Sequence, residues 1–212
     1  VNKFKTNTSK SKNNLMHNLK ILEEYFIGVS EISNKIDKKK VLCLAKQIKS
    51  IKDKFGRIFF LGVGGSAGNT SHAVNDFRKL CNIECYSITD NVSELTARIN
   101  DDGWNSSFSN WLKVSRLTSK DAIFVFSVGG GNIKKKVSVN LIEAAIFAKK
   151  QKCKIFGIVG KKDGYIAKNA DEAVIIPEIN KSLVTPYSEA FQAVVWHALV
   201  SHPILQSNKT KW

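Results

Sequence analysis

Apolar and polar positions follow two different periods along the chain. In its first quarter, the apolar residues recur at steps of three and four, which is the period of an amphipathic helix. One stripe is formed by Leu15, Leu19, Leu22, Phe26 and Val29. A second stripe, after the helix-capping residue Asp37, is formed by Val41, Leu44, Ala45, Ile48 and Ile51. We therefore predict two helices over residues 15–56, after a polar N-terminal tail, residues 1–14, that we expect to be flexible.

From residue 58 onwards, short apolar runs alternate with helical patterns. Strands are predicted over residues 58–63, 83–89, 122–128, 154–159 and 173–177, and helices between them include 138–150 and 185–199. Alternation of this kind is typical of right-handed β-α-β units, which give a parallel sheet covered by helices on both faces. Since no internal repeat or low-complexity linker interrupts the pattern, we predict a single domain over residues 15–205, with its α/β core over 57–205.

The composition fits one globular core. The 212 residues, of which 43% are hydrophobic, are enough for it. No apolar run approaches the roughly 20 residues of a membrane-spanning helix, and the polar N-terminal residues do not have the apolar stretch of a signal peptide, so we expect a cytoplasmic protein without membrane contact. Cys81 and Cys85 have a spacing that suits metal binding, but no second Cys or His pair accompanies them. We interpret the four cysteines as reduced thiols with structural roles.

The formal net charge of +15 raises the question of nucleic-acid binding. Much of this charge precedes the α/β core, since residues 1–57 contain 13 lysines and one arginine against five acidic residues. These lysines are interspersed among polar residues with few aromatic ones, whereas single-stranded nucleic acids are bound by basic grooves with stacking aromatics. We expect a solvated basic surface that attracts anionic substrates, and no nucleic-acid partner.

Glycine-rich loops follow two of the predicted strands. Their sequences are Gly62-Val63-Gly64-Gly65-Ser66 and Ser127-Val128-Gly129-Gly130-Gly131-Asn132, the second ahead of a helix expected to begin near Lys134. Backbone N–H groups at such turns, together with the positive end of the following helix, favour a phosphate or another anion. Because ligands of open α/β sheets bind at the carboxyl ends of the strands, the two loops can line one crevice. With the hydroxyls of Ser66 and Ser127 and the amide of Asn132, this inventory fits a phosphorylated small molecule.

Two other interpretations of the loops stay open at this point. The pattern Gly62-x-Gly64-x-x-Ala67 matches the fingerprint of dinucleotide-binding proteins, with Asp90 near the place of the ribose-binding acid. The glycines can also simply allow a tight turn. Against a dinucleotide, the chain has no second domain that would hold the substrate of a redox reaction.

Two pairs of side chains have the chemistry of metal ligands. His72 and Asp76 are four residues apart in the helix expected after the first loop, so both project from one face. Glu189 and His197 are eight residues apart, about two turns of the last helix, and again share a face. Imidazole and carboxylate groups from two helices make a chemically sensible site for a divalent cation such as zinc.

With these features assembled, the chain resembles the sugar isomerase (SIS) domain family, and within it the sedoheptulose-7-phosphate isomerases, also called phosphoheptose isomerases. The resemblance covers residues 15–205. It rests on the order and spacing of the first glycine loop with His72 and Asp76, Asn100-Asp101-Asp102-Gly103-Trp104, Ser127-x-x-Gly130, Gly160-Lys161-Lys162-Asp163-Gly164, and the last helix with Glu189 and His197.

The resemblance implies a flavodoxin-like, three-layer α/β/α sandwich with a five-stranded parallel sheet. The two N-terminal helices are expected to build a homotetramer with active sites at subunit interfaces. The implied activity is aldose–ketose isomerisation of sedoheptulose 7-phosphate to D-glycero-D-manno-heptose 7-phosphate, or of a related sugar phosphate, through an enediol, in a pathway that supplies heptose for surface glycans. The alternative hypothesis is a non-catalytic SIS module that senses a sugar phosphate or docks on another protein.

Roles for single residues also follow from the resemblance. The substrate is expected to contact Gly64, Gly65, Ser66, Asp101, Ser127, Gly129, Gly130, Gly131, Asn132 and Glu189. A divalent metal, expected to be zinc, is assigned to His72, Asp76, Glu189 and His197. Asp76 is the expected catalytic base and His197 the expected acid.

The sequence departs from the family at several of these positions. The family has Asn in place of Val63, the longer Glu in place of Asp76, and Gln in place of Glu189. The shorter side chain of Asp76 withdraws the base by about 1.5 Å, and misplacement on this scale is costly.

The phosphate loop departs as well. Hydroxyl residues of the family are replaced by Val128, Gly129 and Asn132, and an Asp that contacts substrate is replaced by Pro186. More of the phosphate binding is therefore left to backbone amides and to the lysines at 134–136.

Overall fold

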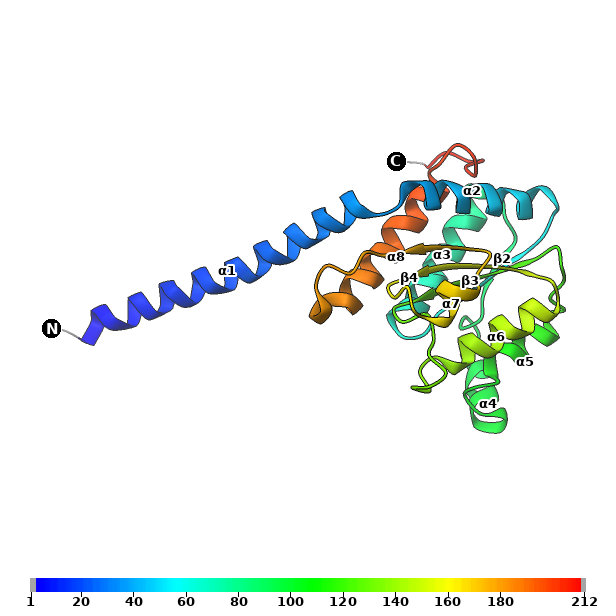
Figure 1. Ribbon diagram of the computed structural model, residues 1–212, viewed down its shortest axis with the longest axis horizontal. Helices are drawn as coiled ribbons and strands as arrows, with labels where there is room; N and C mark the ends of the chain where they lie inside the picture. Colours follow the sequence, from blue (N-terminus) through cyan, green and yellow to red (C-terminus); the bar gives the residue numbers. More distant parts are fainter. Residues whose placement is uncertain (1–2, 211–212) are drawn as a thin grey trace.

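The computed structural model describes residues 3–210, and side chains from residue 14 onwards, as a five-stranded parallel sheet between two layers of helices (Figure 1). The sheet order is β2-β1-β3-β4-β5. The strands are β1 (Ile58–Leu61), β2 (Cys85–Ser87), β3 (Ala122–Ser127), β4 (Lys154–Val159) and β5 (Glu172–Ile175). This order is the flavodoxin-like one, so the predicted fold class is confirmed.

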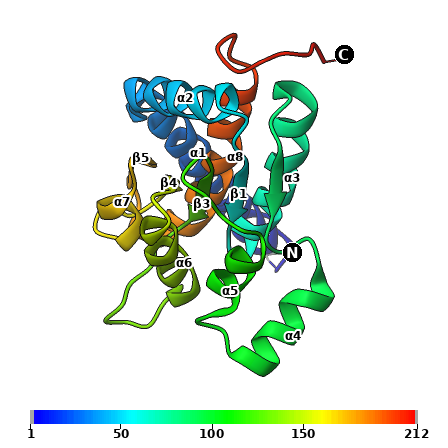
Figure 2. The same cartoon turned by 90° about the vertical axis from the view of Figure 1, so that its right-hand side faces the viewer.

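Alternate residues of the central strands face the two helical layers. Phe60 and Phe124 belong to one buried cluster, whereas their neighbours Phe59 and Ile123 belong to the other. This period of two places a core on each side of the sheet. The first face is covered by α2 (Lys38–Asp53), α3 (Gly65–Cys81) and α8 (Val184–Val200). The second is covered by α5 (Ser107–Val114), α6 (Val139–Lys150) and α7 (Tyr165–Asn169), with α4 (Val92–Asp102) attached at its edge (Figure 2).

The first helix, α1 (Lys3–Lys35), points away from this body over most of its length (Figure 1). Its C-terminal part packs on the domain, where Ile32 is fully buried and the rings of Tyr25 and Tyr187 lie 4.9 Å apart. The structure begins the helix at Lys3 rather than near Leu15, because extending an existing helix costs little even through polar residues. Residues 1 and 2 of the predicted tail lie outside the described range.

The second predicted helix is confirmed as α2, with its cap. The Asp37 side chain accepts hydrogen bonds from the backbone N–H groups of Lys39 (2.9 Å) and Lys40 (3.1 Å). A short 3-10 helix, Lys181–Leu183, precedes α8. Within the described residues, none of the helices is both long and apolar enough to cross a bilayer.

The segment after β3 differs from the prediction. Helix α6 begins at Val139, which confirms the helix predicted over 138–150 but not a start near Lys134, because Ser138 has a left-handed backbone (φ 51°) that a continuous helix does not allow. Between Asn132 and Val137 the chain forms an isolated antiparallel bridge, and the Asn132 side chain accepts a hydrogen bond from the Lys135 N–H. The three lysines at 134–136 therefore lie on an exposed turn rather than on the first turn of a helix.

Candidate functional site

Three of the four predicted metal-ligating side chains come together where α3 and α8 pack side by side. His72 and Asp76 project from α3 one turn apart, and His197 projects from α8. One nitrogen or oxygen atom from each of the three lies within 4.8 Å of the others. Asp76 Oδ2 lies 3.6 Å from His72 Nε2 and 3.4 Å from His197 Nε2. We refer to these residues as the triad.

The surroundings of the triad fix its orientation. Asp76 is buried, and its Oδ2 accepts a hydrogen bond from Trp196 Nε1 (3.1 Å) while its Oδ1 accepts one from Asn75 (3.0 Å). His197 Nδ1 lies 2.9 Å from the Ala193 carbonyl, so Nδ1–H donates to it and Nε2 keeps its lone pair. The two imidazoles, with about half of each side chain exposed, open the triad to the surface.

These residues fit a divalent transition metal. Two imidazole nitrogens and one carboxylate oxygen form the donor set of many catalytic zinc sites, which keep a further position for water or substrate. The hydrogen bond from Nδ1–H of His197 to a backbone carbonyl is the support that such sites give a ligating histidine. The triad is therefore a possible metal-binding site.

Glu189, the fourth predicted ligand, lies elsewhere. It precedes His197 by about two helical turns, roughly 12 Å along α8, and so faces the first turn of α3 rather than Asp76. A Cβ built on Gly65 would lie 2.5 Å from Glu189 Oε2, which places this carboxylate against the first turn of α3. The sequence predicts the face of α8 that carries Glu189 but not which part of α3 lies opposite.

The serines of both glycine loops are buried and bonded within the protein. Ser66 Oγ accepts a hydrogen bond from Gln192 Nε2 (3.0 Å), and Ser127 Oγ accepts one from the Gly130 N–H (3.0 Å). The role of Gln192 could not be predicted from the sequence, since a polar residue on a helix indicates no particular hydrogen-bond partner. Gly64 has a positive φ of 64° as the cap of α3. These contacts shape the loops at the carboxyl ends of β1 and β3.

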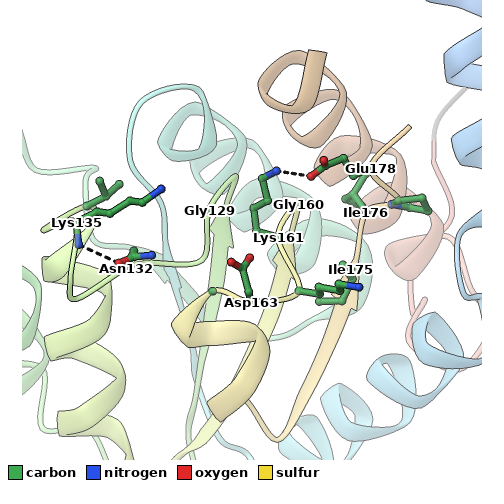
Figure 3. A pocket seen from close by; sticks show the side chains of 13 residues that line it. Gly129, Asn132, Lys135, Gly160, Lys161, Asp163, Ile175, Ile176 and Glu178 are labelled. Atoms are coloured by element: carbon green, nitrogen blue, oxygen red, sulfur yellow. Dashed lines mark hydrogen bonds and ion pairs between the residues drawn. The ribbon is translucent and has the colours of Figure 1, made fainter. Parts of the chain in front are cut away.

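The second glycine loop also lines a cavity of about 870 Å³ at the carboxyl ends of β3, β4 and β5 (Figure 3). Gly129 and Asn132 come from this loop, and the facing walls are residues 160–164 and 175–178. Lys135 and Lys162 bring positive charge, while Lys161 forms an ion pair with Glu178 across the rim. Of the described residues that line this cavity, none belongs to the triad. Residues 160–164 form a motif in the sequence to which no role was assigned, although a glycine-containing loop after a strand is a signal for a ligand-binding wall.

Asp101, the acid expected to hold sugar hydroxyls, is not brought to the triad within one chain. It is exposed in the last turn of α4 and accepts a hydrogen bond from Asn100. Helix α4 packs through Leu95 on the second face of the sheet, whereas the triad lies on the first.

Comparison with known proteins places these features in a family, although no family model matches the chain. The phosphoheptose isomerase of Sulfurimonas denitrificans is 31% identical over 149 residues, which are 68% of this chain and 70% of that protein. A probable phosphoheptose isomerase of Thermoplasma volcanium is 28% identical over 182 residues, 82% and 89% of the two chains. The lincomycin biosynthesis protein LmbN of Streptomyces lincolnensis is 30% identical over 158 residues, but the chain spans only 56% of its length.

Solved structures give the same answer for the fold. A phosphoheptose isomerase from Francisella tularensis has a TM-score of 0.75 at 18% identity, covering 88% of this chain and 97% of that one. The phosphoheptose isomerase from Neisseria gonorrhoeae has a TM-score of 0.74 at 21% identity, covering 88% and 96%. With the sheet order, the two glycine loops and these relatives in agreement, the chain belongs to the phosphoheptose isomerase family of SIS-domain proteins.

Proposed function

We propose that the protein, a sugar-phosphate isomerase by its family, converts sedoheptulose 7-phosphate to D-glycero-D-manno-heptose 7-phosphate, or carries out the same reaction on a related sugar phosphate. The observation that carries this proposal is the triad, because it joins a carboxylate and two imidazoles at one surface. Such groups can move protons between the carbons and oxygens of a bound sugar.

Asp76 and His197 have complementary roles in this proposal. Interconversion of a ketose and an aldose moves a proton between adjacent carbons through an enediol. Asp76 takes the proton from one carbon and returns it to the next, and His197, when its Nε2 carries a proton rather than a metal, exchanges that proton with the neighbouring oxygen. A metal, which we propose to be zinc, would be held by His72, Asp76 and His197 and would polarise the carbonyl group when bound.

The phosphate is proposed to bind at the glycine loops. Gly129, Asn132 and the lysine side chains of the cavity offer donors and positive charge there. Ser66, Ser127, Gly130 and Gly131 are proposed to keep the loops in shape for the substrate, with Gly64 and Gly65 exposed at the start of α3. We assign Glu189 to the same first turn, where its carboxylate faces the sugar rather than the triad.

A homotetramer is proposed as the active form. The part of α1 that extends from the body exposes apolar side chains, including Leu22 (57%), Phe26 (67%) and Ile27 (64%). An apolar stripe of this length indicates a partner, and further copies of this chain supply matching stripes. Assembly also offers a way for Asp101 to reach a site, since in one chain it lies on the other side of the sheet from the triad.

The test is to purify the protein, measure its bound metal and follow sedoheptulose 7-phosphate by NMR. We expect conversion by the wild type and loss of at least 100-fold in kcat for His197→Ala, a typical contribution of a general acid. His202→Ala is the matched control, because His202 lies outside the triad and its imidazole Nδ1 accepts a hydrogen bond from the Ile204 N–H. A metal-replete protein that converts no ketose or aldose phosphate would contradict the proposal. Stabilisation by a sugar phosphate without conversion would then support the sensing module.

A further inference from the structure

Trp196 contacts every member of the triad. Its Nε1–H donates a hydrogen bond of 3.1 Å to Asp76 Oδ2. Its ring centroid lies 5.2 Å from that of His72 and 4.7 Å from that of His197. Only 1% of the surface of Trp196 is exposed, so its ring packs against the buried side of the triad.

The indole ring is itself held by the sheet. It stacks on Phe126 of β3, with ring centroids 5.9 Å apart and planes inclined by only 9°. Phe126 is fully buried and in turn packs edge-on against Phe124 and Phe60. Because interiors are close-packed, the indole cannot turn without disturbing these rings. The direction of its N–H group is therefore set by the core rather than by the triad.

The hydrogen bond from Trp196 is accepted by the carboxylate oxygen of Asp76 that lies nearest to the two imidazoles. Asp76 Oδ2, which accepts from Trp196, is also the atom that approaches the Nε2 atoms of both histidines. An indole N–H is a donor only, so Asp76 Oδ2 is the acceptor, and hydrogen bonds to a carboxylate are stronger than those between neutral groups. We infer that Trp196 is a positioning residue: it holds the carboxylate of Asp76 in the orientation in which Oδ2 and the two imidazoles share one centre. This inference rests on the proposed function, since it concerns how the same site is built.

The experiment compares Trp196→Phe with Trp111→Phe. The first removes the N–H and keeps an aromatic ring, while the second changes a tryptophan that packs against Phe59 on the other face of the sheet. Cobalt(II) binding to the whole protein reports on the triad without turnover, through the affinity and the visible absorption spectrum. We expect Trp196→Phe to bind cobalt at least tenfold more weakly, with an altered spectrum, and to lower kcat more than it changes KM. Trp111→Phe should match the wild type.

Wild-type affinity, spectrum and kcat in Trp196→Phe would overturn the inference. If that variant does not fold, the indole N–H resonance of Trp196 decides the question in metal-free protein. Asp76→Ala removes the acceptor, so this resonance should shift while that of Trp111 stays in place, and an unchanged Trp196 resonance would overturn the inference. This measurement needs neither metal nor substrate, so it separates failure of the positioning role from failure of the proposed isomerase.

Discussion

At the scale of single residues, the ion pair between Arg57 and Asp121 ties β1 to the start of β3. Asp121 is almost fully buried, and its carboxylate accepts hydrogen bonds from the side chain and N–H of Arg57 and from the N–H and hydroxyl of Thr118. Burial acts to raise the pKa of Asp121, but these hydrogen bonds outweigh it and lower the pKa below the usual range. The carboxylate is therefore ionised in the folded protein at every pH near neutrality.

Replacing Asp121 by Ala should lower the free energy of unfolding by about 3 kcal/mol at pH 7, because the Arg57 guanidinium loses its partner. In the unfolded chain the pKa of this carboxyl is about 3.9, and in the folded protein it is lower. The contribution of the ion pair to the free energy of unfolding is therefore complete above the unfolded pKa and is lost as the pH falls through the folded pKa. Urea unfolding at pH 7 and pH 3 measures the difference. Asp53→Ala, which breaks the exposed pair with Lys49, is the control, with an expected cost of no more than about 0.5 kcal/mol. An equal cost at both pH values would contradict the prediction.

The cysteines give a second prediction at this scale. All four are free thiols, as expected from the sequence, and Cys81, Cys85 and Cys153 are buried. Burial raises the pKa of Cys81 to about 11 and that of Cys153 to about 12. Since only the thiolate reacts, we expect at most one thiol, that of Cys43, to react with Ellman's reagent in native protein at pH 8, and all four in urea. Cys43→Ser should then leave the native protein unreactive, and any fast-reacting thiol in that variant would refute the assignment.

Part of the triad could be predicted from the sequence, because the geometry of a helix determines which residues share a face. The four-residue spacing of His72 and Asp76 fixes their common face, and the alternation of strands and helices makes α3 and α8 neighbours. The height at which two helices meet is set by tertiary packing, so the separation of Glu189 from the triad could not be predicted. The role of Trp196 could not be predicted either. Its large apolar ring indicates a core residue, and the hydrogen bond from its N–H to Asp76 depends on how α3 and α8 pack.

At the scale of elements, α2 shows how a local signal decides a boundary. Asp37 lies between the end of α1 and the start of α2, where its side chain accepts hydrogen bonds from two N–H groups in the first turn of α2. Asp37→Ala should cost about 1 kcal/mol of stability, while Asp37→Asn, which caps as well, should cost little. Thermal or urea unfolding distinguishes the two variants. Similar losses in both would mean that the carboxylate charge, rather than the cap geometry, stabilises the helix.

The elements that the sequence predicts least well are those whose ends depend on rare backbone states. All five strands were predicted, because buried parallel strands carry continuous apolar runs. The helix predicted over 138–150 is also confirmed as α6, whereas the helix start expected near Lys134 was wrong, because the bridge between Asn132 and Val137 and the left-handed Ser138 precede the helix. The N-terminal extent of α1 was missed because the polar sequence of residues 3–14 has no apolar stripe to reveal a helix.

At the scale of the whole molecule, the proposed assembly of copies depends on the exposed apolar stripe of α1. Its exposed stripe is too apolar to face water, and burying it between copies would stabilise an assembly in proportion to the area removed from solvent. Phe26→Asp places a charge in this stripe and should lower the mass measured by light scattering from that of a tetramer to that of smaller species. Asn34→Asp adds the same charge at an exposed position on the same helix and should leave the mass unchanged.

Because Asp101 and the triad lie on opposite faces of one chain, dissociation should also reduce sugar-phosphate turnover in Phe26→Asp while its cobalt affinity stays near that of the wild type. A wild-type protein that stays monomeric at micromolar concentration would leave the stripe to a different partner and would require all substrate contacts to come from a single chain.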